Sequence, residues 1–200
     1  MQIETFTGGN YAANGYLIYE KDEAMIVDVP AHTAKKIHEF LQEQKLNLKY
    51  IIVTHVHWDH IEDVDKLKKY TDAKIGIHRF DEQLQIEINS IFEGETGIIK
   101  ADFSLADNEE ITIGAYIFRV IHTPGHTPGS ICIYNEKEKI LFSGDVLFEG
   151  AYGRIDFPLS NTEDMKNSLI RLSKLPSETK VYSGHGKETT IGREKWIKNL

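Results

Sequence analysis

The first third of the chain consists of short apolar runs and one amphipathic segment. Three runs rich in β-branched and aromatic residues are predicted to form strands: QIETFT (2–7), NGYLIYE (14–20) and AMIVDV (24–29). Ala34, Ile37 and Leu41 then share one face of a predicted helix whose other face is charged. KYIIVT (49–54) is a continuous apolar run, which is typical of a strand covered on both faces.

Helical spacing returns after this run. Ile61, Val64 and Leu67 predict a second helix, and AKIGI (73–77) predicts the strand that follows it. Because strand, helix and strand alternate, part of the sheet is expected to be parallel. DEQLQIEINSIF (81–92) is predicted to be helical, within a region whose pattern does not define where that helix ends.

The second half begins with strands again. The predicted strands are EITIG (110–114), YIFRVIHT (116–123), SICIYN (130–135), KILFSG (139–144) and KVYSG (180–184). The polar segment NEKEK (135–139) is predicted to be a hairpin turn. Met165, Leu169 and Leu172 form the stripe of a helix with Asn161 or Thr162 as its N-cap, and a final helix is expected to begin near Thr190.

The order of the predicted elements indicates the fold class. Strands followed by helices occur twice, which fits an α/β protein with two sheets packed face to face and helices outside. The sequence has no internal repeat, low-complexity segment or Pro/Gly/Ser linker, so residues 1–200 are predicted to form one domain.

Composition and charge narrow the possible partners. The net charge of −8 argues against nucleic acid or an anionic membrane as a partner, since both require a basic surface. The N-terminus does not resemble a signal peptide, and no run approaches the ~18 apolar residues of a membrane span. We therefore expect a cytoplasmic protein that acts on a small molecule. Cys132, the only cysteine, is predicted to be a packed strand residue.

Histidine and aspartate gather where predicted strands end. THVHWDH (54–60) contains three of the nine histidines, and HTPGHTPG, SGHG and SGDVLF supply further histidines and an aspartate. Strand-end loops at one edge of a sheet can converge on one point. The candidate metal ligands are His55, His57, Asp59, His60, His126, Asp145 and His185.

The chemistry of these side chains favours divalent metals. Imidazole and carboxylate groups bind zinc and divalent iron or manganese, and one centre needs about three protein ligands. Seven candidates therefore suffice for two centres. A single histidine more often satisfies a turn, but that explanation does not account for six ligands gathered in three loops. We read His32, His38 and His78 as non-ligands, and His122 as a strand residue with a structural or supporting role.

These motifs resemble the metallo-β-lactamase superfamily, in which HxHxDH precedes a later His, Asp and His. The resemblance implies an αββα four-layer sandwich with two mixed sheets and helices on the outer faces. It also implies that one metal is bound by His55, His57 and His126, a second by Asp59, His60 and His185, and that Asp145 bridges them.

Further motifs are similar to short glyoxalase II-type hydrolases, which cleave thioesters. These motifs are HTPGHTPGS, SGDVLF, GRIDFP (153–158) and GHGKETTIGRE (184–194). Full-length glyoxalase II continues into a C-terminal domain that helps to hold glutathione. Zinc β-lactamases of the commonest kind have a cysteine where Asp145 stands, which disfavours an antibiotic hydrolase.

Two divalent metal ions are expected, with Zn²⁺ preferred over Fe or Mn. Together they would supply a bridging hydroxide at neutral pH. Asp59 and Asp145 are the predicted catalytic residues, with Asp59 orienting the nucleophile. Tyr152 is a weaker candidate for substrate binding, and Arg154 is expected to pair with Asp156 or to contact substrate. We therefore expect a dinuclear metallo-hydrolase of thioesters or related esters. The alternatives are a mononuclear iron persulfide dioxygenase and a non-catalytic, metal-stabilised binding protein.

Overall fold

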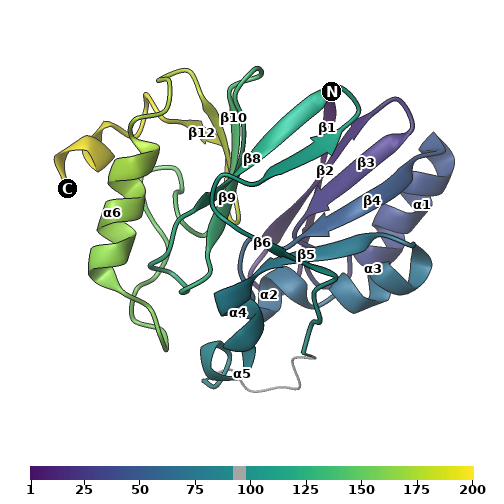
Figure 1. Cartoon of the computed structure of the whole chain (residues 1–200), viewed down its shortest axis with the longest axis horizontal. Coiled ribbons are helices and arrows are strands. Elements are labelled where there is room, and N and C mark those ends of the chain that lie inside the picture. The colour runs from purple at the N-terminus through teal and green to yellow at the C-terminus, as the bar shows by residue number, and fades with distance from the viewer. Residues whose placement is uncertain (92–97) are drawn as a thin grey trace.

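A computed structural model of the chain describes residues 1–91 and 98–200 (Figure 1). The first sheet contains six strands: β1 (Gln2–Gly8), β2 (Ala13–Glu20), β3 (Glu23–Val27), β4 (Asn47–Ile52), β5 (Lys74–His78) and β6 (Phe103–Leu105). They lie in chain order across the sheet. The pairs β1–β2 and β2–β3 are antiparallel, whereas β3 to β6 pair in parallel.

The second sheet also contains six strands: β7 (Glu110–Ile113), β8 (Tyr116–His122), β9 (Ile131–Asn135), β10 (Ile140–Gly144), β11 (Lys180–Ser183) and β12 (Thr189–Thr190). Their order is β12-β11-β10-β9-β8-β7. Only β10 and β11 pair in parallel within it, so both sheets are mixed, as predicted. The antiparallel pairing of β9 with β10 confirms the hairpin at NEKEK.

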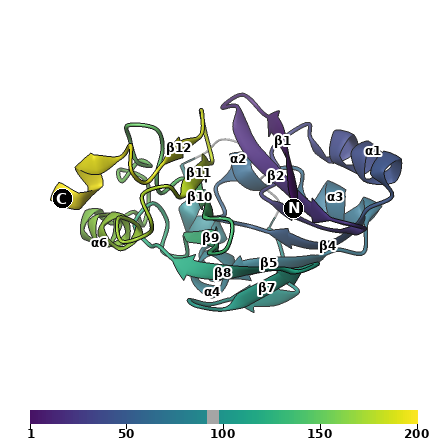
Figure 2. The same ribbon diagram turned by 90° about the horizontal axis from the view of Figure 1, so that it is seen from above.

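Apolar alternation along the strands builds the layers. Tyr16 and Ile18 of β2 face a core between the two sheets, whereas Leu17 faces the opposite side with α1 (Ala34–Gln44) and α3 (Val64–Tyr70). On the second sheet, Cys132 packs in a cluster with α6 (Thr162–Leu172). Figures 1 and 2 show α1 and α3 on one outer side and α6 on the other. The predicted αββα sandwich is confirmed.

Several local predictions are confirmed. The predicted helices coincide with α1 and α6, and Asn161 caps α6 because its side-chain oxygen accepts the Asp164 N–H at 3.0 Å. Cys132 is fully buried in β9, and burial raises the pKa of its thiol to about 12. Among the described residues, no helix is both long enough and apolar enough to span a membrane.

The helix predicted around Ile61, Val64 and Leu67 is interrupted. A first turn, α2 (Trp58–Ile61), ends before α3 begins, so part of THVHWDH is helical rather than a strand-end loop. The interruption occurs because the Asp63 N–H donates to the carbonyl of Val29 at 3.1 Å. The Asp63 carboxylate also accepts the first amides of α1, from Thr33 and Ala34.

Two further predictions need correction. The helix predicted over 81–92 consists of two short pieces, α4 (Arg79–Gln83) and α5 (Gln85–Ile88); Phe92 lies outside the described residues. The helix expected near Thr190 is wrong: Thr190 ends β12, which pairs with β11, and a 3₁₀ helix follows only at Lys195–Asn199. β6 and β12 are too short to produce an alternating pattern, so they were not predicted.

Candidate metal centre

The candidate ligands converge beyond the carboxyl ends of strands from both sheets. His55 and His57 follow β4, while His126 follows β8. Asp145 directly follows β10 and His185 follows β11 after one residue. Asp59 and His60 lie on α2, which carries them to the same place. The structure therefore brings together all seven residues that the sequence analysis singled out.

Three histidines form a first triplet. The ligand nitrogens of His55, His57 and His126 all lie within 4.8 Å of one another, and all three side chains are buried. His57 Nδ1 lies 2.8 Å from His126 Nε2. His57 therefore presents its δ nitrogen to the triplet, whereas His126 presents its ε nitrogen.

A second triplet lies beside the first and is more open. Asp59, His60 and His185 bring one ligand atom each to within 4.8 Å of the others. Nε2 of His185 lies 3.2 Å from both the Asp59 carboxylate and His60 Nε2. The His60 side chain is fully buried, whereas the side chain of His185 is 25% exposed.

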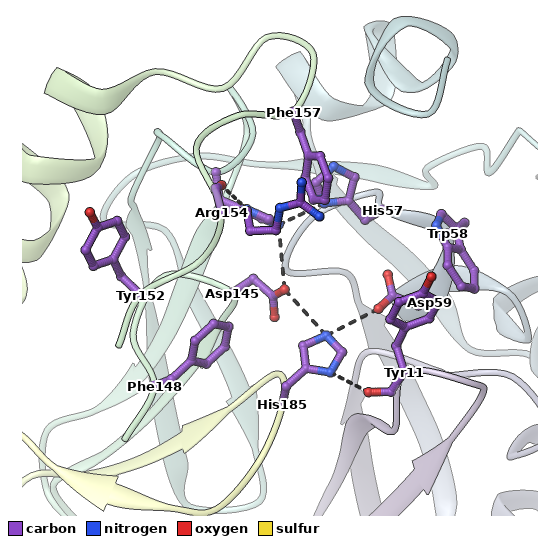
Figure 3. A pocket seen from close by; sticks show the side chains of 11 residues that line it. Tyr11, His57, Trp58, Asp59, Asp145, Phe148, Tyr152, Arg154, Phe157 and His185 are labelled. Carbon is purple, nitrogen blue, oxygen red and sulfur yellow. Dashed lines mark hydrogen bonds and ion pairs between the residues drawn. The ribbon is translucent and has the colours of Figure 1, made fainter. Parts of the chain in front are cut away.

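Asp145 lies close to both triplets, and Figure 3 shows its carboxylate directed toward His185. One carboxylate oxygen, Oδ1, lies 3.3 Å from His60 Nε2. The other, Oδ2, lies 3.6 Å from His126 Nε2 and 3.5 Å from His185 Nε2. One carboxylate is therefore close to ligands of both triplets.

Hydrogen bonds on the far side of the rings determine where the lone pairs point. Nδ1 of His60, His126 and His185 lies 2.7–3.0 Å from oxygens of Asp28, Arg154 and Tyr11 respectively. A carboxylate or carbonyl oxygen can only accept, so each of these nitrogens carries the proton. The three Nε2 lone pairs therefore point into the site, which is the arrangement that metal-binding histidines require.

Asp28 is a supporting residue that the sequence analysis missed. Its carboxylate accepts from the Thr54 N–H at 2.8 Å, from the Thr54 hydroxyl at 2.7 Å and from His60 Nδ1. Because the hydroxyl hydrogen of Thr54 points to Asp28, Thr54 Oγ1 accepts from Nδ1 of His55 at 3.0 Å. Asp28 thus orients one histidine of each triplet. Asp28 lies near the end of the predicted strand 24–29, and this strand-end position is the sequence feature that could have identified it.

The loop that carries His126 depends on a glycine. Gly125 has a φ of +137°, and an added Cβ would lie 2.4 Å from backbone atoms of Met165 in α6. Its carbonyl also accepts the N–H of Asn161, the N-cap of that helix. The tight contact fixes the His126 loop against α6.

The pKa values of the histidines differ between the two triplets. Burial lowers the pKa of His55 well below its usual range and lowers that of His57 to about 3. Burial also opposes charge on His60, but Asp145 and Asp28 hold the pKa of His60 well above its usual range. Burial would raise the pKa of Asp145, but the neighbouring histidines, led by His60, hold it well below its usual value.

The residues fit divalent cations. Nε2 of His60 lies 3.2 Å from Nε2 of His185, and both Nδ1 protons are donated elsewhere, so a cation beside these two Nε2 atoms takes the place of the proton that His60 retains through its raised pKa. Within the described part of the chain, His55 Nε2 and Asp145 Oδ1 are buried atoms without a hydrogen-bond partner. Imidazole and carboxylate donors of this kind suit zinc, iron and manganese.

A cavity of about 450 Å³ opens above both triplets. Its lining residues include metal-ligand candidates and a ring of aromatic side chains: Tyr11, His57, Trp58, Asp59, His126, Asp145, Phe148, Tyr152, Arg154, Phe157 and His185. Tyr11, Phe148 and Phe157 were not predicted as wall residues, because they come from a hairpin and a loop whose sequence carries no directional pattern.

The two weaker candidates line this cavity in different ways. Arg154 forms a bidentate pair with Asp156 at 2.8 Å and lies over the Phe157 ring, so the predicted ion pair is confirmed. In Figure 3 the Tyr152 hydroxyl points away from Asp145, and its ring packs against Trp196.

The remaining histidines lie outside the two triplets. His78, the N-cap of α4, stacks on His122 with ring centroids 4.2 Å apart. His122 also approaches the carbonyl of Pro128 at 2.9 Å, which agrees with a structural position. His38 stacks on Tyr70.

Sequence comparison relates the chain to curated hydrolases. It is 31% identical to the hydroxyacylglutathione hydrolase GloC of Haemophilus influenzae, over 98% of this chain and 95% of that protein. It is also 31% identical to a hydroxyacylglutathione hydrolase of Francisella tularensis subsp. novicida, over 100% of this chain but 70% of the longer relative.

Solved structures show the same fold. A structure described as BLEG-1 B3 metallo-beta-lactamase superimposes with a TM-score of 0.88 at 34% identity, covering 96% of both chains. TTHA1623 in a di-iron-bound form gives a TM-score of 0.84 at 30% identity, again covering 96% of both chains.

Residues 8–185 match the metallo-beta-lactamase superfamily, a span that includes every member of the two triplets and Asp145. With two mixed sheets, outer helices and clustered His and Asp ligands, the chain belongs to this superfamily and is one of its metal-dependent hydrolases.

Proposed function

We propose that this chain is a dinuclear hydrolase that cleaves thioesters. In this proposal His55, His57 and His126 hold one divalent cation, Asp59, His60 and His185 hold the second, and Asp145 contacts both. The observation that carries the proposal is the position of Asp145, within 3.6 Å of ligand nitrogens from both triplets at the floor of the cavity.

The metals and the chain have separate tasks. When bound, zinc or another divalent cation polarises a carbonyl oxygen and makes hydroxide available at neutral pH, because it lowers the pKa of water from 15.7 to about 7. Asp59 lies at the cavity floor with its carboxylate against His185, in position to orient the nucleophile and to accept its proton at a carboxylate oxygen. The aromatic walls exclude water around the substrate.

The substrate class is inferred from the relatives and the cavity. GloC has nearly the same length as this chain and is described as a hydroxyacylglutathione hydrolase, so thioesters of glutathione belong in the first substrate panel. Arg154 lines the cavity and is paired with Asp156. In this proposal its guanidinium group also contacts an anionic group on the thiol portion of the substrate.

The proposal is tested on protein purified without chelator. Elemental mass spectrometry is expected to find about two divalent metal ions per chain, and thioester hydrolysis should stop when a chelator removes them. We expect Asp59→Asn to lower the turnover of thioesters by roughly a hundredfold. Asp102→Asn is the matched control, because Asp102 pairs with Lys68 far from the cavity and should leave turnover unchanged.

A second candidate function is β-lactam hydrolysis. The structural likeness to a protein described as a B3 metallo-beta-lactamase favours it, and the same ligands would serve. A chromogenic cephalosporin in the panel separates the two functions. Faster turnover of the β-lactam than of every thioester would overturn the thioester proposal, and one iron per chain with oxygen uptake on a persulfide would replace it with the dioxygenase alternative.

A further inference from the structure

A short segment outside the ligand motifs contacts both loops of the first triplet. Asp81 lies on α4, below the loops that follow β4 and β8. Its side chain is fully buried, and it does not line the cavity.

The Asp81 carboxylate connects backbone from the two sheets. Its Oδ2 accepts the Val56 N–H at 3.0 Å and the Thr127 hydroxyl at 2.8 Å. Its Oδ1 accepts the Gly129 N–H at 2.6 Å. Val56 follows a strand of the first sheet, and Thr127 and Gly129 follow a strand of the second, so one carboxylate ties the two loops together.

Two of these three contacts lie next to ligands of the first triplet. Val56 stands between His55 and His57, and Thr127 directly follows His126. The second triplet is held by other groups: Asp28 binds His60, and the Tyr11 carbonyl binds His185. The support from Asp81 is therefore concentrated on one triplet.

Neighbouring residues make this contact close. An added Cβ on Gly129 would lie 2.5 Å from Asp81 Oδ1, so only glycine permits the approach. Asn89 donates to the Val56 carbonyl at 2.8 Å and accepts the Trp58 N–H at 3.1 Å. Burial raises the pKa of Asp81 to about 6, which leaves the carboxylate ionised at neutral pH and able to accept from all three donors.

We propose that Asp81 is a positioning residue for the first metal site, where it sets the spacing of His55 and His57 from His126 by tying their loops together. The inference rests on the proposed function only in requiring that the triplets bind metal. Residues that orient ligands from outside the coordination shell typically change metal affinity by about 10–100-fold.

The test isolates each site before changing Asp81. His185→Ala leaves the first triplet intact, and His57→Ala leaves the second intact. Zn²⁺ affinity is measured in each background by competition with a chromophoric chelator, with and without Asp81→Asn. We expect Asp81→Asn to weaken Zn²⁺ binding by about 10–100-fold in the His185→Ala background and by less than about threefold in the His57→Ala background.

The outcomes separate this inference from the proposed function. If the protein with all seven ligands binds no Zn²⁺, the proposed function fails. If it binds two ions but Asp81→Asn weakens both sites equally, or neither, the positioning role is overturned while the function stands.

A matched control and a milder variant guard against general destabilisation. Glu194 is also buried and accepts three hydrogen bonds, from Gly150, Thr189 and Trp196, so Glu194→Gln should leave first-site affinity unchanged.

If Asp81→Asn does not fold, as judged by circular dichroism, Thr127→Val removes one of the three contacts to Asp81 with little change in side-chain shape. It should give a smaller loss, again confined to the first site; unchanged affinity there would overturn the inference.

Discussion

The two ligand triplets use the same chemistry but are supported differently. The first consists of three buried histidines on loops that Asp81 joins from below. The second combines a buried histidine with Asp59 and His185, whose side chains are 13% and 25% exposed.

This difference assigns different tasks to the two halves of one site. Fully buried groups move little, whereas partly exposed groups meet solvent and substrate. The first triplet is therefore expected to hold its metal more firmly, and the second to exchange its metal more readily. In the metal-free protein the second site must also displace a proton, because the pKa of His60 is raised and that of His57 is lowered.

The largest expected effect comes from removing the residue that the triplets share. Asp145→Ala should lower thioester turnover by at least about a hundredfold and bring metal content below two ions per chain, because its carboxylate lies near ligands of both triplets. Kinetics and elemental mass spectrometry on the same preparation check this. Two retained ions with unchanged turnover would show that the triplets work independently of Asp145.

A pair of glycine substitutions tests the separation of the two supports. A Cβ on Gly184 would lie 2.2 Å from Asp145 Oδ1 and 2.7 Å from His60 Cε1, whereas one on Gly129 would strike Asp81. Gly184→Ala should therefore weaken the second site more than the first, because it displaces His60 as well as the shared Asp145, and Gly129→Ala should weaken the first site more than the second, each by about tenfold or more at the more affected site.

Competition with a chelator at increasing metal-to-protein ratios measures the affinity for the first and for the second metal ion. Equal weakening of both steps by either alanine would show that the site responds as one rigid unit, and the comparison of two supports would then fail.

Asp28→Asn should moderately weaken metal binding at both sites. Asp28 contacts His60 directly and His55 through Thr54, so both sites should weaken by about tenfold. Asparagine suits the positive φ of 60° at this position, which limits the effect on folding. Metal titration provides the measurement, and weakening confined to one site would assign Asp28 to that site alone.

The smallest effect concerns acid stability beneath the first triplet. Burial, with His122 and Arg79, lowers the pKa of His78 to about 4. A depressed pKa adds stability that is present above the unfolded value near 6.5 and is lost as the pH falls through about 4. His78→Asn keeps an N-cap on α4, which carries Asp81, but removes this titration.

Urea unfolding of both proteins at neutral pH and near pH 4 measures the effect. The wild type should lose about 1–2 kcal/mol more than the variant on acidification. Both proteins release metal in acid, so metal loss affects them equally. The difference between their losses of unfolding free energy therefore measures the contribution of His78. Equal losses would show that this histidine is not held neutral.

Much of the fold could be predicted because each strand faces different surroundings on its two sides. The apolar run of β2 follows from burial of both faces of that strand, and the stripe of Met165, Leu169 and Leu172 in α6 follows from burial of one face of the helix. The break between α2 and α3 could not be predicted, because the Asp63 amide binds a carbonyl of a distant segment. β12 depends on pairing with β11, which no local pattern encodes.

The sequence by itself determined which residues are suited to bind metal, since HxHxDH and the later His, Asp and His carry the necessary donors at strand ends. Only the tertiary structure decided how they are supported. Asp28 and Asp81 gain their roles from hydrogen bonds to residues between 25 and 48 positions away. Donor chemistry belongs to the side chain and can be read locally, whereas the orientation of a donor depends on neighbours that only folding brings together.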